Sequence, residues 1–188
     1  MATDVARHLT TAELEAGLDE IRRAPADDGT IELIVRRPAE GEREVLTEGV
    51  LDPAEGLVGD MWKRRGSKRT PDGSAHPDMQ LTLMSARVVD LVAASDRERW
   101  ALAGDQLYVD FDISAANLPP GTRLALGSAV IEVTPEPHTG CAKFHARFGG
   151  DAHRFVNTKQ HRDLRLRGLN AKIVEPGTVS TGDTIRKL

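Results

Sequence analysis

The stretch best suited to chemistry is residues 137–149, which read P-H-T-G-C-A-K-F-H-A-R-F-G. It contains Cys141, the one cysteine of the chain, at the expected start of a helix. A helix N-terminus stabilises an anion and so lowers the pKa of a thiol placed there. Cationic or ionisable side chains surround the thiol in the sequence, namely His138, Lys143, His145 and Arg147. Together these features favour a thiolate at Cys141.

A thiolate at Cys141 can act as a nucleophile, carry sulfane sulfur or bind a soft metal. His145 follows four residues later, which predicts that both lie on one helical face. His145 and His138 are therefore candidate bases for the thiol. The alternative is that Cys141 is an inert core residue, since free cysteines are commonly buried.

A second group of candidates is a basic loop. Residues 63–77 contain no apolar residue except Ala75, so we expect them to be exposed. The cations of this loop are Lys63, Arg64, Arg65, Lys68 and Arg69. They either form a solvated surface or gather anions at the rim of a pocket. A nucleic-acid partner is disfavoured, because the loop has no aromatic residue to stack on bases and the net charge is −4.

Several other kinds of site lack support in the sequence. Four aspartates flank predicted turns, and most are expected to shape them; they are Asp60, Asp78, Asp105 and Asp110. The histidine spacing matches no zinc motif, and the glycine motifs that bind nucleotides are missing. A single cysteine excludes an internal disulfide and a multi-cysteine metal or iron–sulfur site.

Length and composition indicate one globular domain with a small extension. The chain has 188 residues, of which 39% are hydrophobic and 29% charged, so global disorder is not expected. No apolar run approaches the roughly 20 residues that span a bilayer, and the N-terminus lacks the apolar core of a secretory signal. We therefore expect a cytoplasmic protein with no membrane partner.

The predicted elements suggest a barrel behind an N-terminal helix. Thr10 and Glu13 form a possible capping box for an amphipathic helix over residues 10–24. We expect residues 1–29 to be a helical extension and residues 30–188 to form the main domain. Strands are predicted over 31–36, 43–51, 79–83, 107–113, 123–126, 129–134, 171–175 and 184–187. Helices are predicted from Ser85 to about residue 94 and over 141–158, broken at Gly149-Gly150. This pattern predicts a mainly β fold with some helices, as a β-barrel or strongly curved sheet.

In order along the chain, several segments resemble the MOSC domain, the C-terminal domain of molybdenum cofactor sulfurases. G-L-V-G-D at 56–60 resembles the family's G-x-x-G-D, and P-D-M-Q-L-T-L at 77–83 contains its D-x-Q. A-G-D-Q-L-Y-V at 103–109 is similar to its G-E-N-L segment. The hairpin at 120–134 and the closing segment R-G-L-N-A-K-I-V-E-P-G-T-V-S-T-G-D at 167–183 also match, and Cys141 stands where the family has its cysteine.

The resemblance also has departures. The family often has a histidine two residues after the aspartate of the G-D pair. In this sequence that position is Trp62, so the histidine is missing. Gly140 precedes the cysteine where proline is common, and Asp105-Gln106 replaces the glutamate–asparagine pair. These differences concern the cofactor and the substrate more than the fold.

The resemblance implies a MOSC-type β-barrel with short helices and a functional Cys141. In relatives this cysteine is proposed to carry sulfur or to ligate the molybdenum of the molybdenum cofactor, molybdopterin. The family precedent for catalysis is molybdenum-dependent reduction of N-hydroxylated compounds, which needs an electron-donor protein. Sulfur transfer would need a donor such as a cysteine desulfurase. Pyridoxal phosphate accompanies the larger sulfurases, but their desulfurase domain is absent from these 188 residues.

The predicted site combines Cys141 with the nearby cations. We expect Cys141 to be the catalytic residue or the molybdenum ligand. Molybdopterin or another anionic small molecule would be held by His138, Lys143, Arg147, Asp60, Lys63, Arg64 and Arg65. Two alternatives stay open: an enzyme that uses Cys141 as nucleophile, and a non-catalytic module that binds a small anion.

Overall fold

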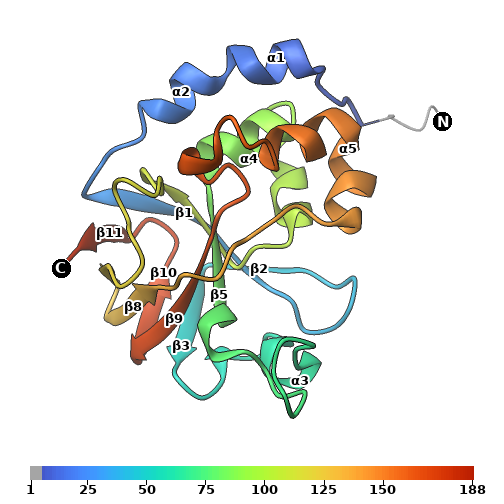
Figure 1. Ribbon diagram of the computed structural model, residues 1–188. Coiled ribbons are helices and arrows are strands. Elements are labelled where there is room, and N and C mark those ends of the chain that lie inside the picture. Colours follow the sequence, from blue (N-terminus) through green and yellow to red (C-terminus); the bar gives the residue numbers. More distant parts are fainter. Residues whose placement is uncertain (1–5) are drawn as a thin grey trace.

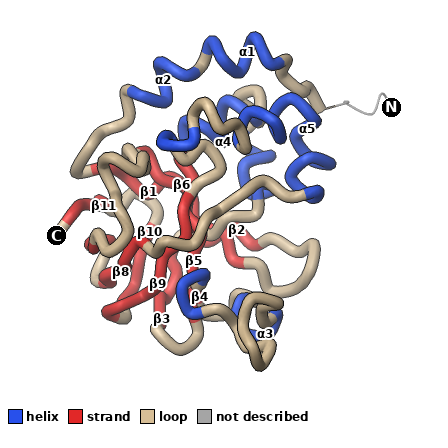
Figure 2. Tube along the Cα trace, in the orientation of Figure 1, coloured by secondary structure: helices blue, strands red, loops and turns tan. Residues whose placement is uncertain are grey.

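The computed structural model describes residues 6–188, whose strands and helices are shown in Figures 1 and 2. The strands are β1 (Gly29–Arg36), β2 (Glu44–Leu46), β3 (Glu48–Asp52), β4 (Gly56–Leu57), β5 (Leu81–Ser85), β6 (Leu107–Asp110), β7 (Arg123–Leu126), β8 (Ala129–Val133), β9 (Leu169–Glu175), β10 (Gly177–Ser180) and β11 (Thr184–Lys187). The α-helices are α1 (Thr11–Ala16), α2 (Leu18–Arg22), α3 (Trp62–Arg65), α4 (Ala86–Val92) and α5 (Ala142–Val156). Short 3₁₀ helices are η1 (Pro77–Met79), η2 (Arg97–Ala103) and η3 (Arg162–Leu164).

Seven strands close into a β-barrel. Their order is β11-β7-β8-β9-β5-β6-β1, and β1 pairs back with β11 to complete the ring. Strand β2 extends the sheet beside β1, while β10, β3 and β4 form a separate three-stranded sheet. Every pairing is antiparallel except β5–β6, which are joined through α4 and η2. The predicted fold class, a mainly β barrel with some helices, is confirmed.

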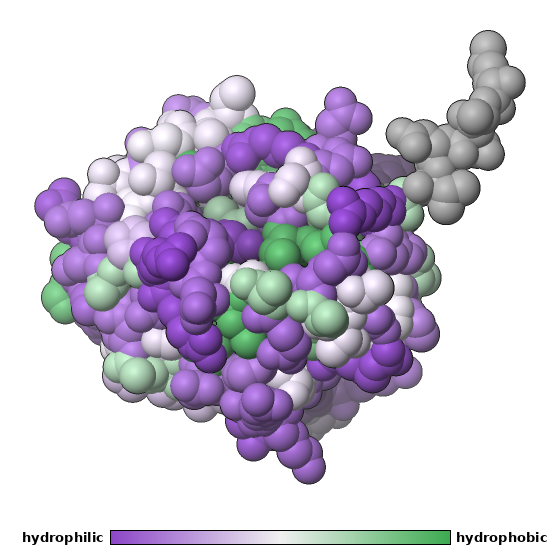
Figure 3. Space-filling view, turned by 90° about the horizontal axis from the view of Figure 1, so that it is seen from above, coloured by the Kyte–Doolittle hydropathy of each residue, from purple (hydrophilic) through white to green (hydrophobic). Residues whose placement is uncertain are grey.

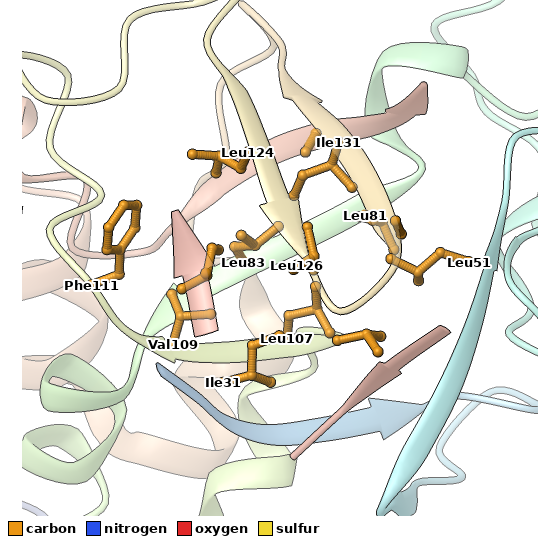
Figure 4. Close-up of a cluster of buried hydrophobic side chains, with 14 of the residues drawn as sticks. Ile31, Leu51, Leu81, Leu83, Leu107, Val109, Phe111, Leu124, Leu126 and Ile131 are labelled. Atoms are coloured by element: carbon orange, nitrogen blue, oxygen red, sulfur yellow. The ribbon is translucent and has the colours of Figure 1, made fainter. Parts of the chain in front are cut away.

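The barrel interior is filled by apolar side chains that alternate along the strands. Figure 4 shows several of them converging, including Leu83 from β5, Leu107 and Val109 from β6, and Leu126 from β7. Alternate residues of a strand point to opposite faces, so each strand presents one such row inward. Burial of each side chain contributes about 1.5–3 kcal/mol, which makes this cluster the main source of barrel stability.

A second apolar cluster lies outside the barrel, under the helices. The helices α1, α2, α4 and α5 lie together at one end of the molecule, in the upper part of Figure 1. Their apolar faces cover Val35, Met84 and Tyr108, which point outward from β1, β5 and β6. In the sequence, apolar residues alternate with Tyr108, Asp110 and Asp112 over 107–113, which predicts a half-buried strand with Tyr108 on its polar face. That prediction is wrong for Tyr108, which is fully buried beside Trp100 because the helical layer covers both.

The N-terminal helices are anchored in this second cluster. The capping box is confirmed: the Thr10 hydroxyl accepts a hydrogen bond from the Glu13 backbone N–H, and the Glu13 carboxylate accepts one from the Thr10 N–H. The helix divides at Gly17, where a Cβ would come within 2.5 Å of Leu91 on α4. None of the helices within residues 6–188 has the length and apolar character needed to cross a bilayer.

The other strands and helices agree with the sequence predictions in part, and strand pairing explains where they differ. The hairpin through Gly127-Ser128 forms β7 and β8, and α5 breaks at Gly149 as predicted. Residues 43–51 form two strands rather than one, because β2 pairs with β1 while β3 pairs with β10. The predicted loop 63–77 includes part of α3, and β10 and η2 were not predicted.

Candidate functional site

Cys141 lies at the beginning of α5, as its N-cap, in extended backbone conformation. The residue is exposed and lines a cavity of about 720 Å³. The walls come from the segment after β1, from α3 and the loop that follows it, from the end of η2, and from the segment that joins β8 to α5. This volume falls in the range of small-molecule sites, roughly 300–1,000 Å³. The predicted position of the thiol at a helix start is confirmed.

The cavity is strongly cationic. Its lining includes one carboxylate, that of Glu40, and seven basic residues: Arg37, Arg43, Arg65, Lys68, Lys143, Arg147 and Arg167. Lys143 pairs with Glu40 at the exposed rim. Arg37 and Arg167 pair with carboxylates behind the lining, those of Asp60 and Asp105. Four lining cations then have no carboxylate partner among residues 6–188, so the cavity favours an anionic ligand.

A buried charge network forms the wall behind the thiol. The Asp105 carboxylate accepts hydrogen bonds from Arg167 Nη1 at 2.6 Å and from His138 Nε2 at 2.8 Å. Burial would raise the pKa of Asp105, but the charge of Arg167 and the bond from His138 outweigh it and lower the pKa to about 2. Burial, helped by the charge of Arg167, lowers the pKa of His138 despite the nearby Asp105. The network therefore contains an ionised carboxylate, an arginine and a neutral imidazole at neutral pH.

A second buried ion pair supports the opposite wall. Both carboxylate oxygens of Asp60 accept hydrogen bonds from the Arg37 side chain at 2.9 Å, and Asp60 also binds the backbone N–H groups of Arg37 and Trp62. Burial acts to raise the pKa of Asp60, but the bonds and charge of Arg37 lower it overall. Asp60 thus holds Arg37 in place rather than lining the cavity.

The C-terminal end of η2, together with its C-cap Gly104, binds arginines from distant parts of the chain. Three successive backbone carbonyls each accept a hydrogen bond from one arginine. The Leu102 carbonyl accepts from Arg147 at 2.7 Å and the Ala103 carbonyl from Arg167 at 2.9 Å. The Gly104 carbonyl accepts from Arg37 at 2.9 Å. Carbonyls at a helix C-terminus carry partial negative charge, which attracts cations. This segment therefore brings these guanidinium groups to one side of the cavity.

Five of the predicted site residues come together and three do not. Cys141, His138, Lys143, Arg147 and Arg65 all line the cavity. The other three predicted residues do not line it. Lys63 pairs with Glu55, and Arg64 donates to the Pro38 carbonyl at 2.6 Å. Asp60 lies behind Arg37, with which it pairs. His145 stacks on His153 with ring centroids 5.4 Å apart and is not part of the lining.

Several lining residues were not predicted from the sequence. They are Arg37, Glu40, Arg43, Met79, Thr82, Arg167 and Asn170. A signal existed for Arg167, which opens the R-G-L-N segment, and for Arg37, which directly follows an apolar strand. Arg43 carried no signal, since an arginine at the start of a predicted strand resembles any surface residue.

Three polar atoms of residues that line the cavity are buried without a hydrogen-bond partner. Within residues 6–188, Arg43 Nε, Arg167 Nε and Asn170 Oδ1 are buried without hydrogen-bond partners, and all three residues line this cavity. Buried polar groups are normally satisfied, so the cavity lacks two acceptors and one donor that a ligand can supply. In the same residues, His, Cys, Asp and Glu side chains form no group of three or more suited to holding a metal ion. A metal here would rely on the single thiol and on ligands it brings with it.

Comparisons with known proteins agree on the fold. YuaD from Bacillus subtilis is 16% identical, with a TM-score of 0.59 over 84% of this chain and 93% of that chain. YiiM from Escherichia coli is 18% identical, with a TM-score of 0.52 over 85% of this chain and 69% of that chain. A search of curated proteins finds no significant match. The sequence model of the MOSC domain matches residues 70–186, which include Cys141 and most of the cavity lining. Because this match spans more than half of the sequence, the chain belongs to the MOSC domain family.

Proposed function

We propose that this protein binds the molybdenum cofactor in the Cys141 cavity, with the Cys141 sulfur as a ligand of molybdenum. The observation that carries the proposal is an exposed thiol on a cavity lined by seven basic residues and one carboxylate. Thiolate is a soft ligand that suits such a metal, and the cations suit an anionic organic part. The family is linked to this cofactor in general.

The residues present fit the chemistry of a molybdenum–pterin group. Its heterocycle offers N–H donors, which match the unpartnered buried Oδ1 of Asn170. Its phosphate is an acceptor, which matches cations such as Arg65 and Lys68. The cavity of about 720 Å³ has room for a ligand of this size.

His138 and Arg167 would orient the bound group. His138 is neutral because burial and Arg167 lower its pKa, so it adds no further positive charge to the cavity. Asp105 binds both side chains and keeps their positions rigid. When bound, the cofactor would supply a redox centre for oxygen-atom transfer, with electrons from a separate donor protein.

Sulfur transfer is a second candidate, because the same thiol is exposed and accessible to a donor protein. The Cys141 thiolate would attack the outer sulfur of a persulfide on the donor. The donor's S–S bond breaks and its cysteine leaves as a thiolate, so the step needs no oxidant. The product is a persulfide on Cys141.

Elemental analysis and intact mass spectrometry test both candidates on protein purified gently from molybdenum-replete cells. Molybdenum that is lost in Cys141→Ser supports cofactor binding. An added sulfur atom that cyanide removes, without molybdenum, supports sulfur transfer. Thr139→Ala is the matched control, because Thr139 is an exposed lining residue without a thiol and its replacement should change neither readout.

Absence of both molybdenum and added sulfur from correctly folded protein would contradict both candidates. The remaining interpretations would then be a thiol enzyme and a binding module for small anions. In the structure His145 stacks on His153, so a thiol enzyme would depend on His138 as its base. A Cys141→Ser variant that still bound the anion would favour the binding module.

A further inference from the structure

A second cavity lies among the helices and is separate from the Cys141 cavity. Its volume is about 690 Å³, and it shares no lining residue with the Cys141 cavity within residues 6–188. The lining comes from α1, α2 and the residues just before α1, and from α4, the turn after α4 and η2, with one residue each from β1 and β6. The helices α1, α2 and α4 lie together at the upper end of the molecule in Figure 1. This helical cleft has room for a small molecule.

The helical cleft is acidic, whereas the Cys141 cavity is basic. Its lining contains five carboxylates and two arginines. Four of the carboxylates pair with an arginine, and these are Glu13, Glu20, Glu32 and Asp110. The fifth, Asp90 on α4, has no basic partner within residues 6–188. A cation that enters the cleft would therefore meet an unpaired carboxylate.

The turn that follows α4 fixes the position of Asp90. The Asp90 Oδ2 accepts a hydrogen bond from the Ser95 hydroxyl at 3.1 Å, and the Asp90 backbone carbonyl accepts one from the Ser95 N–H at 2.8 Å. Ser95 has φ +60°, a left-handed conformation that is strained for an L-residue. In the described part of the chain, the other carboxylate oxygen of Asp90, Oδ1, has no hydrogen-bond donor. This oxygen is available to a ligand.

Trp100 brings an unsatisfied hydrogen-bond donor to the lining of the cleft. The residue is 5% exposed, and its Nε1 is buried without a partner among residues 6–188. The other tryptophan, Trp62, donates its Nε1–H to the His76 carbonyl at 3.3 Å. Buried polar groups are normally satisfied, and an indole N–H can only donate. A ligand that offers an oxygen acceptor would satisfy Trp100.

Apolar side chains complete the lining of the cleft. Leu9, before α1, and Leu91, on α4, are partly buried and pack against the second apolar cluster. A Cβ on Gly17 would come within 2.5 Å of Leu91, so the junction of α1 and α2 lies directly against α4. A ligand with an apolar body would remove the remaining apolar surface of Leu9 and Leu91 from water.

We propose that the helical cleft binds a small amine. Its protonated amino group pairs with Asp90, its apolar body covers Leu9 and Leu91, and an uncharged oxygen accepts the hydrogen bond from Trp100 Nε1. The acceptor is uncharged because the acidic lining repels a carboxylate or a phosphate. This site goes beyond the proposed function and does not depend on Cys141.

The test titrates the full chain with phenylalaninol, a probe that carries a protonated amino group, a phenyl ring and a hydroxyl. Calorimetry measures the Kd, and ¹H–¹⁵N NMR follows the two indole N–H signals. We expect binding at roughly millimolar concentrations and a shift of the Trp100 signal. The Trp62 signal is the internal control, because Trp62 already has an acceptor. Absence of binding, or a shift of the Trp62 signal alone, would overturn the proposal.

Two further probes each lack one of the recognised groups. The alcohol 3-phenylpropanol has no amino group, and 2-phenylethylamine has no oxygen. Each should bind about three- to tenfold more weakly than phenylalaninol, because one polar contact is lost. Binding of 3-phenylpropanol as tight as that of phenylalaninol would overturn the assignment of an amine. Equally tight binding of 2-phenylethylamine would overturn the assignment of an oxygen acceptor.

Substitution of Asp90 tests the ion pair. Asp90→Asn should weaken binding of phenylalaninol and 2-phenylethylamine about three- to tenfold and leave 3-phenylpropanol unchanged, because only the amines lose an ion pair. Asp96→Asn is the matched control: Asp96 is exposed, lies near Asp90 in the sequence and does not line the cleft. It should change each Kd by less than about twofold. Equal effects of the two substitutions would contradict a pair between the amine and Asp90.

Substitution of Trp100 tests the hydrogen bond to the ligand. Trp100→Phe removes the N–H and keeps an aromatic ring, so it should weaken binding of phenylalaninol and leave 2-phenylethylamine unchanged. Because Trp100 is buried, the NMR spectrum first checks that this variant folds. Asp90→Asn changes a partly exposed residue, so the proposal stays testable if Trp100→Phe does not fold.

Cys141→Ser separates this site from the proposed function. The variant should bind phenylalaninol like the wild type, because Cys141 does not line the helical cleft. Loss of phenylalaninol binding in Cys141→Ser would overturn the separation of the two sites. A protein without molybdenum or added sulfur that still binds phenylalaninol would contradict the proposed function alone.

Discussion

Asp105 shows how one residue can organise a site that it does not line. Its carboxylate is fully buried and balances Arg167 while accepting the hydrogen bond from His138. Both partners line the Cys141 cavity, whereas Asp105 does not. The positions of two cavity side chains therefore depend on a buried charge behind them.

Replacing the Asp105 carboxylate should destabilise the folded protein. We expect Asp105→Asn to lower the free energy of unfolding by about 3–5 kcal/mol, because it leaves Arg167 charged and buried without its partner. Chemical denaturation measures the change. Asp19→Asn is the control: its side chain is 81% exposed and pairs with the exposed Arg22, so the effect should stay within about 0.5 kcal/mol. Equal effects of the two substitutions would contradict the assigned role.

The same carboxylate predicts a pH dependence of stability. Its pKa is about 2 in the folded protein and about 3.9 in an unfolded chain, so ionisation stabilises the fold above about pH 4. This contribution, about 2–3 kcal/mol, should be lost progressively as the pH falls from about 5 to about 1. Denaturation curves at several pH values should show a steeper acid loss for the wild type than for Asp105→Asn. Parallel curves would show that Asp105 is not the group responsible.

At the scale of elements, α5 carries both the candidate thiol and the break that shapes the helix. Gly149 has φ +87°, and a Cβ there would come within 2.8 Å of His8 Nδ1. The break changes the direction of the helix, and both parts pack against the second cluster: Phe144 and Phe148 before the break, and Phe155 and Val156 after it. Phe144 also packs under Arg167, which connects the helix to the buried charge network.

Alanine substitutions at Gly149 and Gly150 should show whether stability depends on the positive φ of Gly149 or only on the presence of a glycine at this point of the helix. Gly149→Ala should destabilise the protein by about 1–2 kcal/mol or more, because an L-residue is strained in the left-handed region. Gly150→Ala should be neutral or stabilising by up to about 1 kcal/mol, since Gly150 has no positive φ and alanine favours helix. Thermal or chemical denaturation compares the pair. A larger loss for Gly150→Ala would show that the break is not maintained by Gly149.

At the scale of the whole molecule, two apolar clusters share the barrel wall between them. One fills the interior and the other lies under the helices. The helical face is mostly polar at its surface, with apolar patches between the polar side chains (Figure 3). The division into a helical extension over residues 1–29 and a main domain over residues 30–188 stays a prediction of the sequence.

Hydrogen exchange on two core variants tests that prediction. Leu14→Ala should lower the opening free energy of α1 and α2 by about 2–5 kcal/mol, while barrel amides keep their protection. Leu83→Ala removes a side chain from the barrel interior and should reduce protection throughout the molecule. Loss of protection in the barrel as large for Leu14→Ala as for Leu83→Ala would contradict an independent extension.

Much of the local structure was predictable because its causes lie within a few residues. The capping box at Thr10 and Glu13, the hairpin at Gly127-Ser128 and the break at Gly149 each depend on neighbours in the chain. Burial of Tyr108 was not predictable, because it depends on helices that cover the outer face of the barrel. The same limit explains why residues 43–51 divide between two sheets.

By itself the sequence determined a mainly β chain with one thiol at a helix start, close to His138, Lys143 and Arg147, because these features follow from periodicity, turns and caps. Only the tertiary structure decided which charges share a cavity with that thiol. Arg37, Arg43 and Arg167 are far from Cys141 in the chain, and they meet it through the closed strand order and the C-terminal end of η2. Side chains so distant in sequence become neighbours only when long-range pairing closes the barrel, and no local pattern specifies that.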